Sequence, residues 1–155
     1  RERVWVDLED WQSRLAAAVA HGEDGHSGLA HVFFDFPGAL LPHESIPSWA
    51  LDAAERVRRQ WLDLASRLAH ALEAHQDPAG AQAVHLRALE TYPDCVTCYE
   101  ALIRLRLAQG DRDGALDDYA RYQRLCAPTS DRRSSIAIGS MIAPLLKASP
   151  TDSVH

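Results

Sequence analysis

Apolar residues recur every three or four positions along most of the chain, which is the spacing of one face of an α-helix. The alternation of apolar and polar residues that strands require never lasts for more than a few positions. These stripes predict a first helix over 7–22 and a long helix that begins at Pro47 or Ser48 and ends near Ala74. The seam of the long helix consists of Val57, Trp61, Leu64, Leu68 and Leu72. We therefore expect an all-α fold with six or seven helices.

Turn-forming residues divide the rest of the chain into shorter elements. Asp77 is a suitable N-cap for a helix that ends at Pro93, and further helices are expected over 95–109 and 111–126. We expect a loop at "HGEDGHSG", one or two helical turns at "LAHVFFDF" and an ordered turn region at "FPGALLPHESIPSW", because proline fixes φ and lacks the backbone donor. One more helix is expected at "TSDRRSSIAIGSMIAPLL", weakened by its glycine and its proline.

The aromatic residues indicate both a core and a possible surface. Three tryptophans fall on apolar stripes and are expected in the core: Trp11, Trp49 and Trp61. Three phenylalanines are crowded together, and at least one of them is expected to be exposed: Phe33, Phe34 and Phe36. An exposed aromatic patch would mark an interface.

The chain also resembles itself at a spacing of 34 residues, which is the length of a tetratricopeptide unit. This shift places "DPAGA" on "DRDGA". Ala81 and Ala115 are expected where the two helices of a hairpin approach most closely, since a larger side chain would push them apart. We therefore predict tetratricopeptide-like hairpin units over 62–95 and 96–128 that stack into a short right-handed superhelix.

Two cysteines stand in the motif "CVTC" of residues 95–98, at the joint between these units. A structural zinc site needs four converging ligands, and the third cysteine, Cys126, lies about one repeat away. A thioredoxin-like redox site would need a βαβ context that the pattern does not offer. We therefore expect packing thiols at a helix start, with Asp94 or Thr97 as the cap and Thr97 with Glu100 as a capping box. Zinc or redox use stays open as the alternative.

Composition and motifs argue against several classes of function. A net charge of −6 is unfavourable for binding a nucleic-acid backbone, and no apolar run is long enough to cross a membrane. The eight histidines never stand at the spacing that places two imidazoles on one helix face, so no metal site is expected. No phosphate loop, Gly-x-Ser-x-Gly motif or carboxylate pair in an evident pocket indicates an enzyme or a cofactor. Three cysteines are typical of a reducing compartment, so a cytoplasmic location is expected.

Three segments carry a resemblance to a known family. They are "VWVDLEDWQSRLAAA", "FPGALLPHESIPSWALDAAERVRRQWLDLASRLA" and "GDRDGALDDYARYQRL". In this order they resemble the bacterial transcriptional activation domain, which begins with an extended V-x-V-D and continues through a turn and an arginine-rich long helix into a tetratricopeptide pair. The family occurs in winged-helix antibiotic regulatory proteins and in large ATP-dependent regulators with LuxR-type DNA-binding ends. The chain departs from the family at "LCAPTS", where a leucine-glycine-valine-x-proline linker is usual, and at His75-Gln76, where a glycine is typical.

The resemblance implies one regulatory domain over 4–146, and we expect a disordered tail over 147–155. It implies an interaction module of a bacterial transcriptional regulator, without catalytic residues, that couples a signal or self-association to a DNA-binding domain absent from this chain. The expected partners are proteins: other domains of the parent regulator, the transcription machinery or a second copy in a homo-oligomer. The missing initiator methionine fits a fragment or a processed product.

Two sets of residues are candidates for partner binding. The concave face of the stacked units is predicted to carry Asp63, Arg67, His70, Glu73, Glu100, Arg104, Leu107 and Ala108. A basic patch is formed by Arg56, Arg58 and Arg59. The alternatives are a solvated helix face without a special role and local pairing of these arginines with Asp52, Glu55 or Asp63.

Two other classes of function stay open. One is a free-standing tetratricopeptide adaptor or chaperone that binds a peptide and has no connection with DNA. The other is a small-molecule sensor with a pocket between the first helix and the proline-rich turn.

Overall fold

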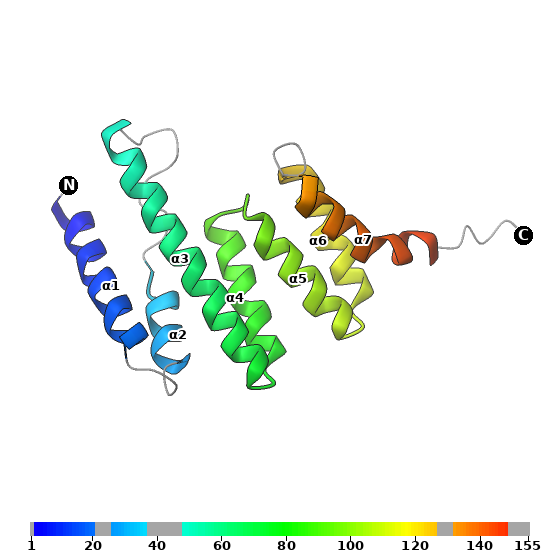
Figure 1. Cartoon of the computed structure of the whole chain (residues 1–155), viewed down its shortest axis with the longest axis horizontal. Helices are drawn as coiled ribbons and strands as arrows, with labels where there is room; N and C mark the ends of the chain where they lie inside the picture. The colour runs from blue at the N-terminus through cyan, green and yellow to red at the C-terminus, as the bar shows by residue number, and fades with distance from the viewer. Residues whose placement is uncertain (1, 21–25, 37–47, 127–131, 149–155) are drawn as a thin grey trace, which may run out of the picture. The chain divides into compact units, whose positions relative to one another are not determined.

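The structure of the chain is a computed structural model that describes residues 2–20, 26–36, 48–126 and 132–148 (Figure 1). These residues form seven α-helices, and no strand occurs among them. The helices are α1 (Glu2–Ala20), α2 (His26–Phe34), α3 (Ser48–Ala74), α4 (Pro78–Thr91), α5 (Val96–Ala108), α6 (Arg112–Leu125) and α7 (Arg132–Ala148). The predicted all-α fold with six or seven helices is therefore confirmed.

The helices belong to two compact units, Arg1–Val84 and His85–His155. The division falls inside α4, so the first unit contains α1, α2, α3 and the start of α4. The second unit contains the end of α4 with α5, α6 and α7. The predicted hairpin unit over 62–95 spans the division, and the superhelical stacking of the hairpins stays a prediction.

Four aromatic rings form the centre of the first unit, where α2 packs against both α1 and α3. Phe33 of α2 stacks on Trp61 of α3, with ring centroids 4.7 Å apart and ring planes at 10°. The ring of Phe36 lies 5.0 Å from the ring of Trp61 and 5.0 Å from the ring of Trp11 on α1. Nε1 of Trp11 donates a hydrogen bond to the Val32 carbonyl at 2.9 Å, which satisfies the polar atom of that indole. Trp11 and Trp61 are fully buried, as predicted.

Two helix starts in the first unit differ from the sequence prediction. Residues 4–7 are part of α1 rather than extended, and no glycine or proline interrupts the helix there. α2 begins at His26, inside the predicted loop, where Gly28 faces the Ala18 side chain of α1. The side chain of Trp49 and the turn region over 37–47 lie outside the described residues.

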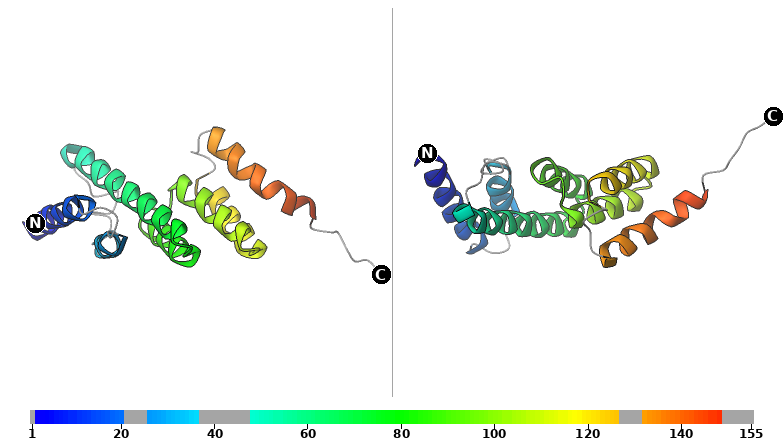
Figure 2. Two further views of the ribbon diagram at one scale, coloured as in Figure 1. Left: turned by 60° about the horizontal axis from the view of Figure 1, so that its bottom comes forward. Right: turned by 90° about the horizontal axis from the view of Figure 1, so that it is seen from above.

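In the second unit α5 and α6 form an antiparallel hairpin, and α7 packs against both helices (Figures 1 and 2). Ile138 and Ile142, one turn apart on α7, are fully buried. The hydroxyls of Tyr122 on α6 and Ser135 on α7 lie 3.0 Å apart and form a hydrogen bond. The last helix therefore docks on the hairpin although "LCAPTS" departs from the family's usual linker.

The last helix also ends two residues later than predicted. α7 continues past Pro144, whose missing N–H deprives only the carbonyl four residues earlier of a helical partner. Lys147 lies in the last turn, where a positive charge interacts favourably with the helix dipole. Lys147 and Ala148 are thus helical and do not belong to the predicted tail, of which 149–155 lies outside the described residues.

The helices α4 and α6 begin with the same capping geometry at positions 34 residues apart. Oδ1 of Asp77 accepts the N–H of Gly80 at 2.9 Å, and Oδ1 of Asp111 accepts the N–H of Gly114 at 3.0 Å. A Cβ atom on either glycine would overlap the capping carboxylate in its present position, so a larger residue would require that side chain to shift. The predicted cap at Asp77 is therefore confirmed, and Asp111 caps α6 in the same way.

The correspondence extends to the residues around the caps. Ala81 and Ala115 are both fully buried, as the hairpin prediction requires. Gln76 has φ +59° and Gly110 has φ +79°, so both turns pass through the left-handed region just before the cap. This conformation costs a residue with a Cβ atom about 1–2 kcal/mol. The first turn therefore carries backbone strain that glycine relieves in the second.

The cap of α5 differs from the prediction. The N-cap residue is Cys95, with φ −75° and ψ 93°, and its side chain makes no capping hydrogen bond. Its N–H donates to the Tyr92 carbonyl at 3.1 Å, which closes the preceding turn and starts the helix at the next residue. Asp94 therefore lies before the cap and Thr97 lies inside the helix, so the predicted capping box with Glu100 is wrong.

Replacing Gln76 with glycine is expected to raise the free energy of unfolding by about 0.5–1 kcal/mol, because glycine adopts the left-handed conformation with less strain. The measurement is urea denaturation followed by far-UV circular dichroism. Gln109→Gly is the matched control: Gln109 ends α5 with φ −89°, so glycine removes no strain there and is expected to lower stability. A Gln76→Gly protein no more stable than the parent would contradict the strain assigned to this turn.

Candidate functional site

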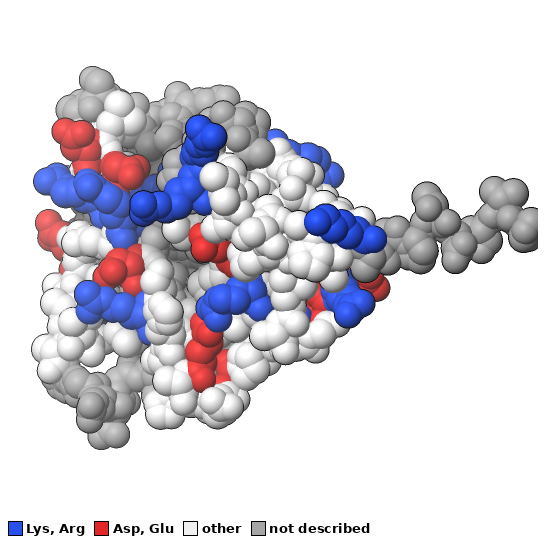
Figure 3. Space-filling view, turned by 45° about the vertical axis from the view of Figure 1, so that its right-hand side comes forward, with Lys and Arg blue, Asp and Glu red and all other residues white. Residues whose placement is uncertain are grey.

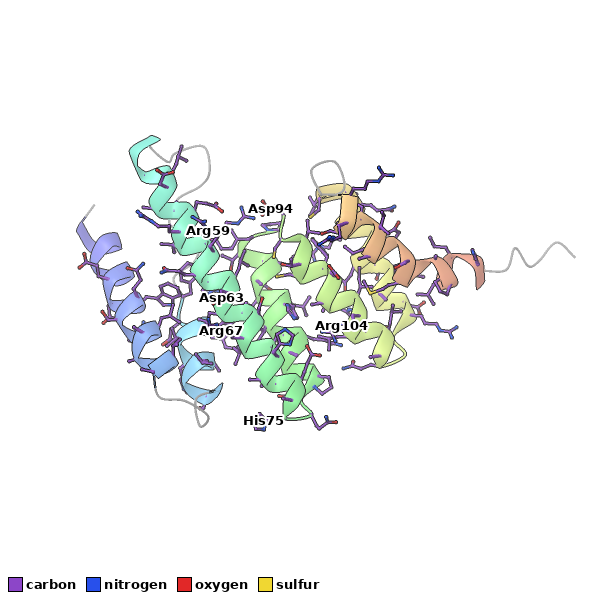
Figure 4. All side chains as sticks on the ribbon, in the orientation of Figure 1. Arg59, Asp63, Arg67, His75, Asp94 and Arg104 are labelled. Atoms are coloured by element: carbon purple, nitrogen blue, oxygen red, sulfur yellow. The ribbon has the colours of Figure 1, made fainter. Side chains whose placement is uncertain are left out.

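The first unit carries its share of the predicted binding face on the outward side of α3. Asp63, Arg67 and His70 are exposed, and Glu73 is half-buried. Oδ2 of Asp63 and Nε of Arg67 form an ion pair at 2.9 Å, with 64% and 58% of the two side chains exposed (Figure 4). An exposed pair of this kind contributes at most about 0.5 kcal/mol to stability. Both groups are accessible to a binding partner.

The basic patch lies on the same helix, toward its N-terminus. Arg56 and Arg59 are exposed, and Arg58 is half-buried. Nε of Arg59 donates to the backbone carbonyl of Glu55 at 3.4 Å rather than to a carboxylate. Arg59 precedes Asp63 by one helical turn, so the basic patch runs directly into the charged stripe of α3 (Figure 4). Figure 3 shows positive and negative side chains interspersed on one face of the molecule.

The second unit carries its share of the predicted face on α5. Arg104 (Figure 4) and Ala108 are exposed, whereas Glu100 and Leu107 are half-buried. The opposite side of α5 is buried and consists of Cys98, Tyr99, Leu102, Ile103 and Leu105. The helical phase read from the sequence therefore places these residues outward, as expected. We call the outward stripe of α3 the α3 face; it consists of Arg59, Asp63, Arg67, His70 and Glu73. We call the outward stripe of α5 the α5 face; it consists of Glu100, Arg104, Leu107 and Ala108.

A charge network that sequence reasoning missed joins α5 to α6. Nε of Arg106 contacts Oδ2 of Asp118 at 2.6 Å, and Nη1 of Arg106 contacts Oδ2 of Asp111 at 2.6 Å. The side chain of Asp118 is only 6% exposed, while the neighbouring Asp117 is exposed, as expected for adjacent helix positions. The sequence carries a signal for the contact of Arg106 with Asp111, because Arg106 stands just before the turn that ends at this capping residue.

The network is a structural feature of the hairpin. The N–H of Gly114 and then the Arg106 guanidinium hold the pKa of Asp111 below its ordinary value. Burial raises the pKa of Asp118, and the adjacent Arg106 opposes that rise. Hydrogen bonds and ion pairs at close distance occupy all three side chains, so the network fixes the turn between α5 and α6.

All three cysteines lie in the second unit, and all three are buried. The sulfur atoms of Cys95 and Cys98 lie 2.9 Å apart, and Sγ of Cys95 lies 3.3 Å from Oγ1 of Thr97. Sγ of Cys126 donates to the carbonyl of Pro93 at 3.7 Å, on the turn that leads into the pair. The contact with Cys95 and burial raise the pKa of Cys98 well above its ordinary value, and burial raises the pKa of Cys126. All three thiols therefore fill core space, as the packing interpretation expects.

Two further properties of the described residues bear on the candidate sites. No group of three or more histidine, cysteine, aspartate or glutamate side chains among them is arranged to hold a metal ion. Within the same part of the chain, every helix is too short or too polar to cross a membrane.

In comparisons with known proteins, no family model, no curated protein and no solved structure matches the chain.

Proposed function

We propose that this chain is a regulatory and protein-interaction module of a bacterial transcriptional regulator. The observation that supports the proposal is the recurrence of one turn-and-cap geometry, with a capping aspartate, a buried alanine and a left-handed turn residue at a 34-residue spacing. Repeated hairpins of this kind present exposed helix faces on which peptides and partner helices bind. The resemblance of three segments to the bacterial transcriptional activation domain supports the connection with transcription.

The α3 face and the α5 face would each supply binding energy for a protein partner. Both alternate in charge, with Arg59, Asp63 and Arg67 on one and Glu100 and Arg104 on the other. A helix or peptide with the complementary alternation suits such a face, and the free energy of binding would shift an equilibrium between conformations or oligomers. The partner is another domain of the parent regulator, the transcription machinery or a second copy, and DNA is contacted by a separate domain.

A reporter assay tests this proposal. The chain is fused to an unrelated DNA-binding domain whose operator lies upstream of a weak bacterial promoter, and transcription is compared with that of the DNA-binding domain alone. The fusion is expected to raise transcription from this promoter. The reading frame that encodes the chain is also expected to contain a DNA-binding or ATPase segment. A frame that encodes neither, together with an inactive fusion, would overturn the proposal.

Replacing Arg104 with glutamate is expected to leave the fold intact and to reduce the reporter signal of the fusion about tenfold, because a reversed charge on the α5 face repels the partner's acidic group. Far-UV circular dichroism checks the fold. Arg112→Glu is the matched control, since Arg112 is exposed and the same change of charge then falls on α6 instead of α5. Equal signals from the two variants would exclude the α5 face as the binding surface.

The free-standing adaptor is the second candidate, because its function would use the same two faces. It differs from the regulator in the reporter assay, where an adaptor fusion is expected to be silent. The sensor hypothesis places its pocket partly at 37–47, outside the described residues, and no observation favours it.

A further inference from the structure

Two of the three cysteines place their sulfur atoms in contact at the start of α5. The distance between Sγ of Cys95 and Sγ of Cys98 is 2.9 Å, compared with about 2.05 Å in a disulfide. Cys95 is the N-cap residue and Cys98 lies in the first helical turn. Residues three positions apart at a helix start have Cα atoms about 5 Å apart, inside the range of roughly 4.4–6.8 Å that a disulfide bridges. The backbone therefore already has a geometry that an S–S bond accepts.

The same pair is poorly suited to a structural metal. Such a site needs four ligands, and the described residues contain no cluster of three or more side chains able to supply them. Cys126 uses its sulfur as a donor to the Pro93 carbonyl and packs against the turn before the pair. The geometry thus favours a two-thiol chemistry of Cys95 and Cys98.

The pair of buried cysteines follows directly on an exposed turn. Cys95 and Cys98 are 4% and 5% exposed, but the turn that precedes them contains the exposed residues Pro93 and Asp94 (Figure 4). The cap also lacks a side-chain hydrogen bond, so the start of α5 is held less firmly than that of α6, whose cap does make one. Fraying of the first turn of α5 would therefore bring the thiols to solvent.

We propose that Cys95 and Cys98 form a redox-active dithiol site that a low-molecular-weight disulfide oxidises to an intramolecular disulfide. The thiolate of one cysteine attacks the disulfide reagent, forms a mixed disulfide and releases one reagent thiol. The thiolate of the other cysteine then attacks the mixed disulfide, forms the Cys95–Cys98 bond and releases the second reagent thiol. Two protein thiols and one reagent disulfide thus give one protein disulfide and two reagent thiols, with two electrons and two protons passing to the reagent. The proposal of this site does not rest on the proposed function in transcription.

Oxidation is expected to fix the N-cap of α5 to its first turn. The thiolate is the attacking species, and both the hydrogen bond with Cys95 and burial raise the pKa of Cys98. The rate of oxidation is therefore expected to increase steadily with pH. The outward stripe that contains Arg104 lies further along the same helix, so a change at its start would reach a helix that the proposed function uses.

The folded chain is incubated with oxidised glutathione, and thiols are counted with a chromogenic disulfide reagent after denaturation. The count is expected to fall from three to one, the mass to fall by two hydrogen atoms, and peptide mapping to link Cys95 to Cys98. Dithiothreitol should restore all three thiols. Retention of three thiols by the folded protein, a disulfide that includes Cys126, or a disulfide-linked dimer would each overturn the proposal.

Alanine variants separate the pair from its neighbour. Cys126→Ala is the matched control, because it removes another buried thiol of the same turn and is expected to retain the disulfide. Cys95→Ala and Cys98→Ala are each expected to abolish it. If either variant does not fold, the mapping of the parent protein still decides the outcome.

Discussion

Replacing Trp61 with alanine is expected to lower the free energy of unfolding by about 3–5 kcal/mol. The indole is fully buried in α3, where it stacks on Phe33 and lies against Phe36. Its Nε1 donates to the Phe33 carbonyl at 3.3 Å, so the substitution also removes a buried hydrogen bond between α2 and α3. The change would leave a cavity at the centre of the first unit, and urea denaturation measures its cost.

Two variants make the Trp61 result specific. Leu51→Ala removes an apolar side chain from the same helix, but Leu51 is exposed, so the expected loss is less than about 1 kcal/mol. Trp61→Phe retains an aromatic ring and loses the indole N–H, so its stability should fall between those of the parent and Trp61→Ala. Equal stabilities of Trp61→Ala and Leu51→Ala would show that the aromatic cluster does not hold the first unit together.

Helix starts and ends were predictable where the signal is local. Asp77 and Asp111 cap their helices through glycines three residues later, and both features are visible in the sequence. The start of α1 was not, because a stretch such as Val4–Asp7 is compatible with either a helix or an extended segment. The cap at Cys95 was also missed, because a turn bond to the Tyr92 carbonyl determines where α5 begins and thiols have no marked capping preference.

The candidate surfaces could be predicted from the sequence as far as the helical period alone determines which residues point outward. Once a helix is assigned, its 3.6-residue period determines that Asp63, Arg67 and Arg104 point outward. The contact of Arg106 with Asp118 could not be found in this way, because it joins different helices and depends on how closely they approach. The same holds for the sulfur contact at the start of α5, since the motif spacing permits it but the side-chain rotamers decide it.

Replacing Ala115 with tryptophan is expected to destabilise the second unit by about 3 kcal/mol or more, a severe case of overpacking. Ala115 is fully buried on the first turns of α6, next to the cap at Asp111 and close to the buried ion pair of Asp118. An indole at this position has to displace α5 from α6 or turn the start of α6 away from it. Either movement would also strain the contacts of Arg106 with Asp111 and Asp118. The measurement is the urea midpoint, followed by far-UV circular dichroism.

Ala120→Trp distinguishes overpacking from the presence of a bulky residue in α6. Ala120 lies on the same helix but is exposed, so the indole there meets water and stability is expected to change by less than about 1 kcal/mol. If Ala115→Trp were as stable as Ala120→Trp, the two helices would not approach closely at Ala115. The hairpin spacing shared with Ala81 would then lose its physical basis, and with it the proposed relation to tetratricopeptide regulators, because that relation depends on a small residue at this contact.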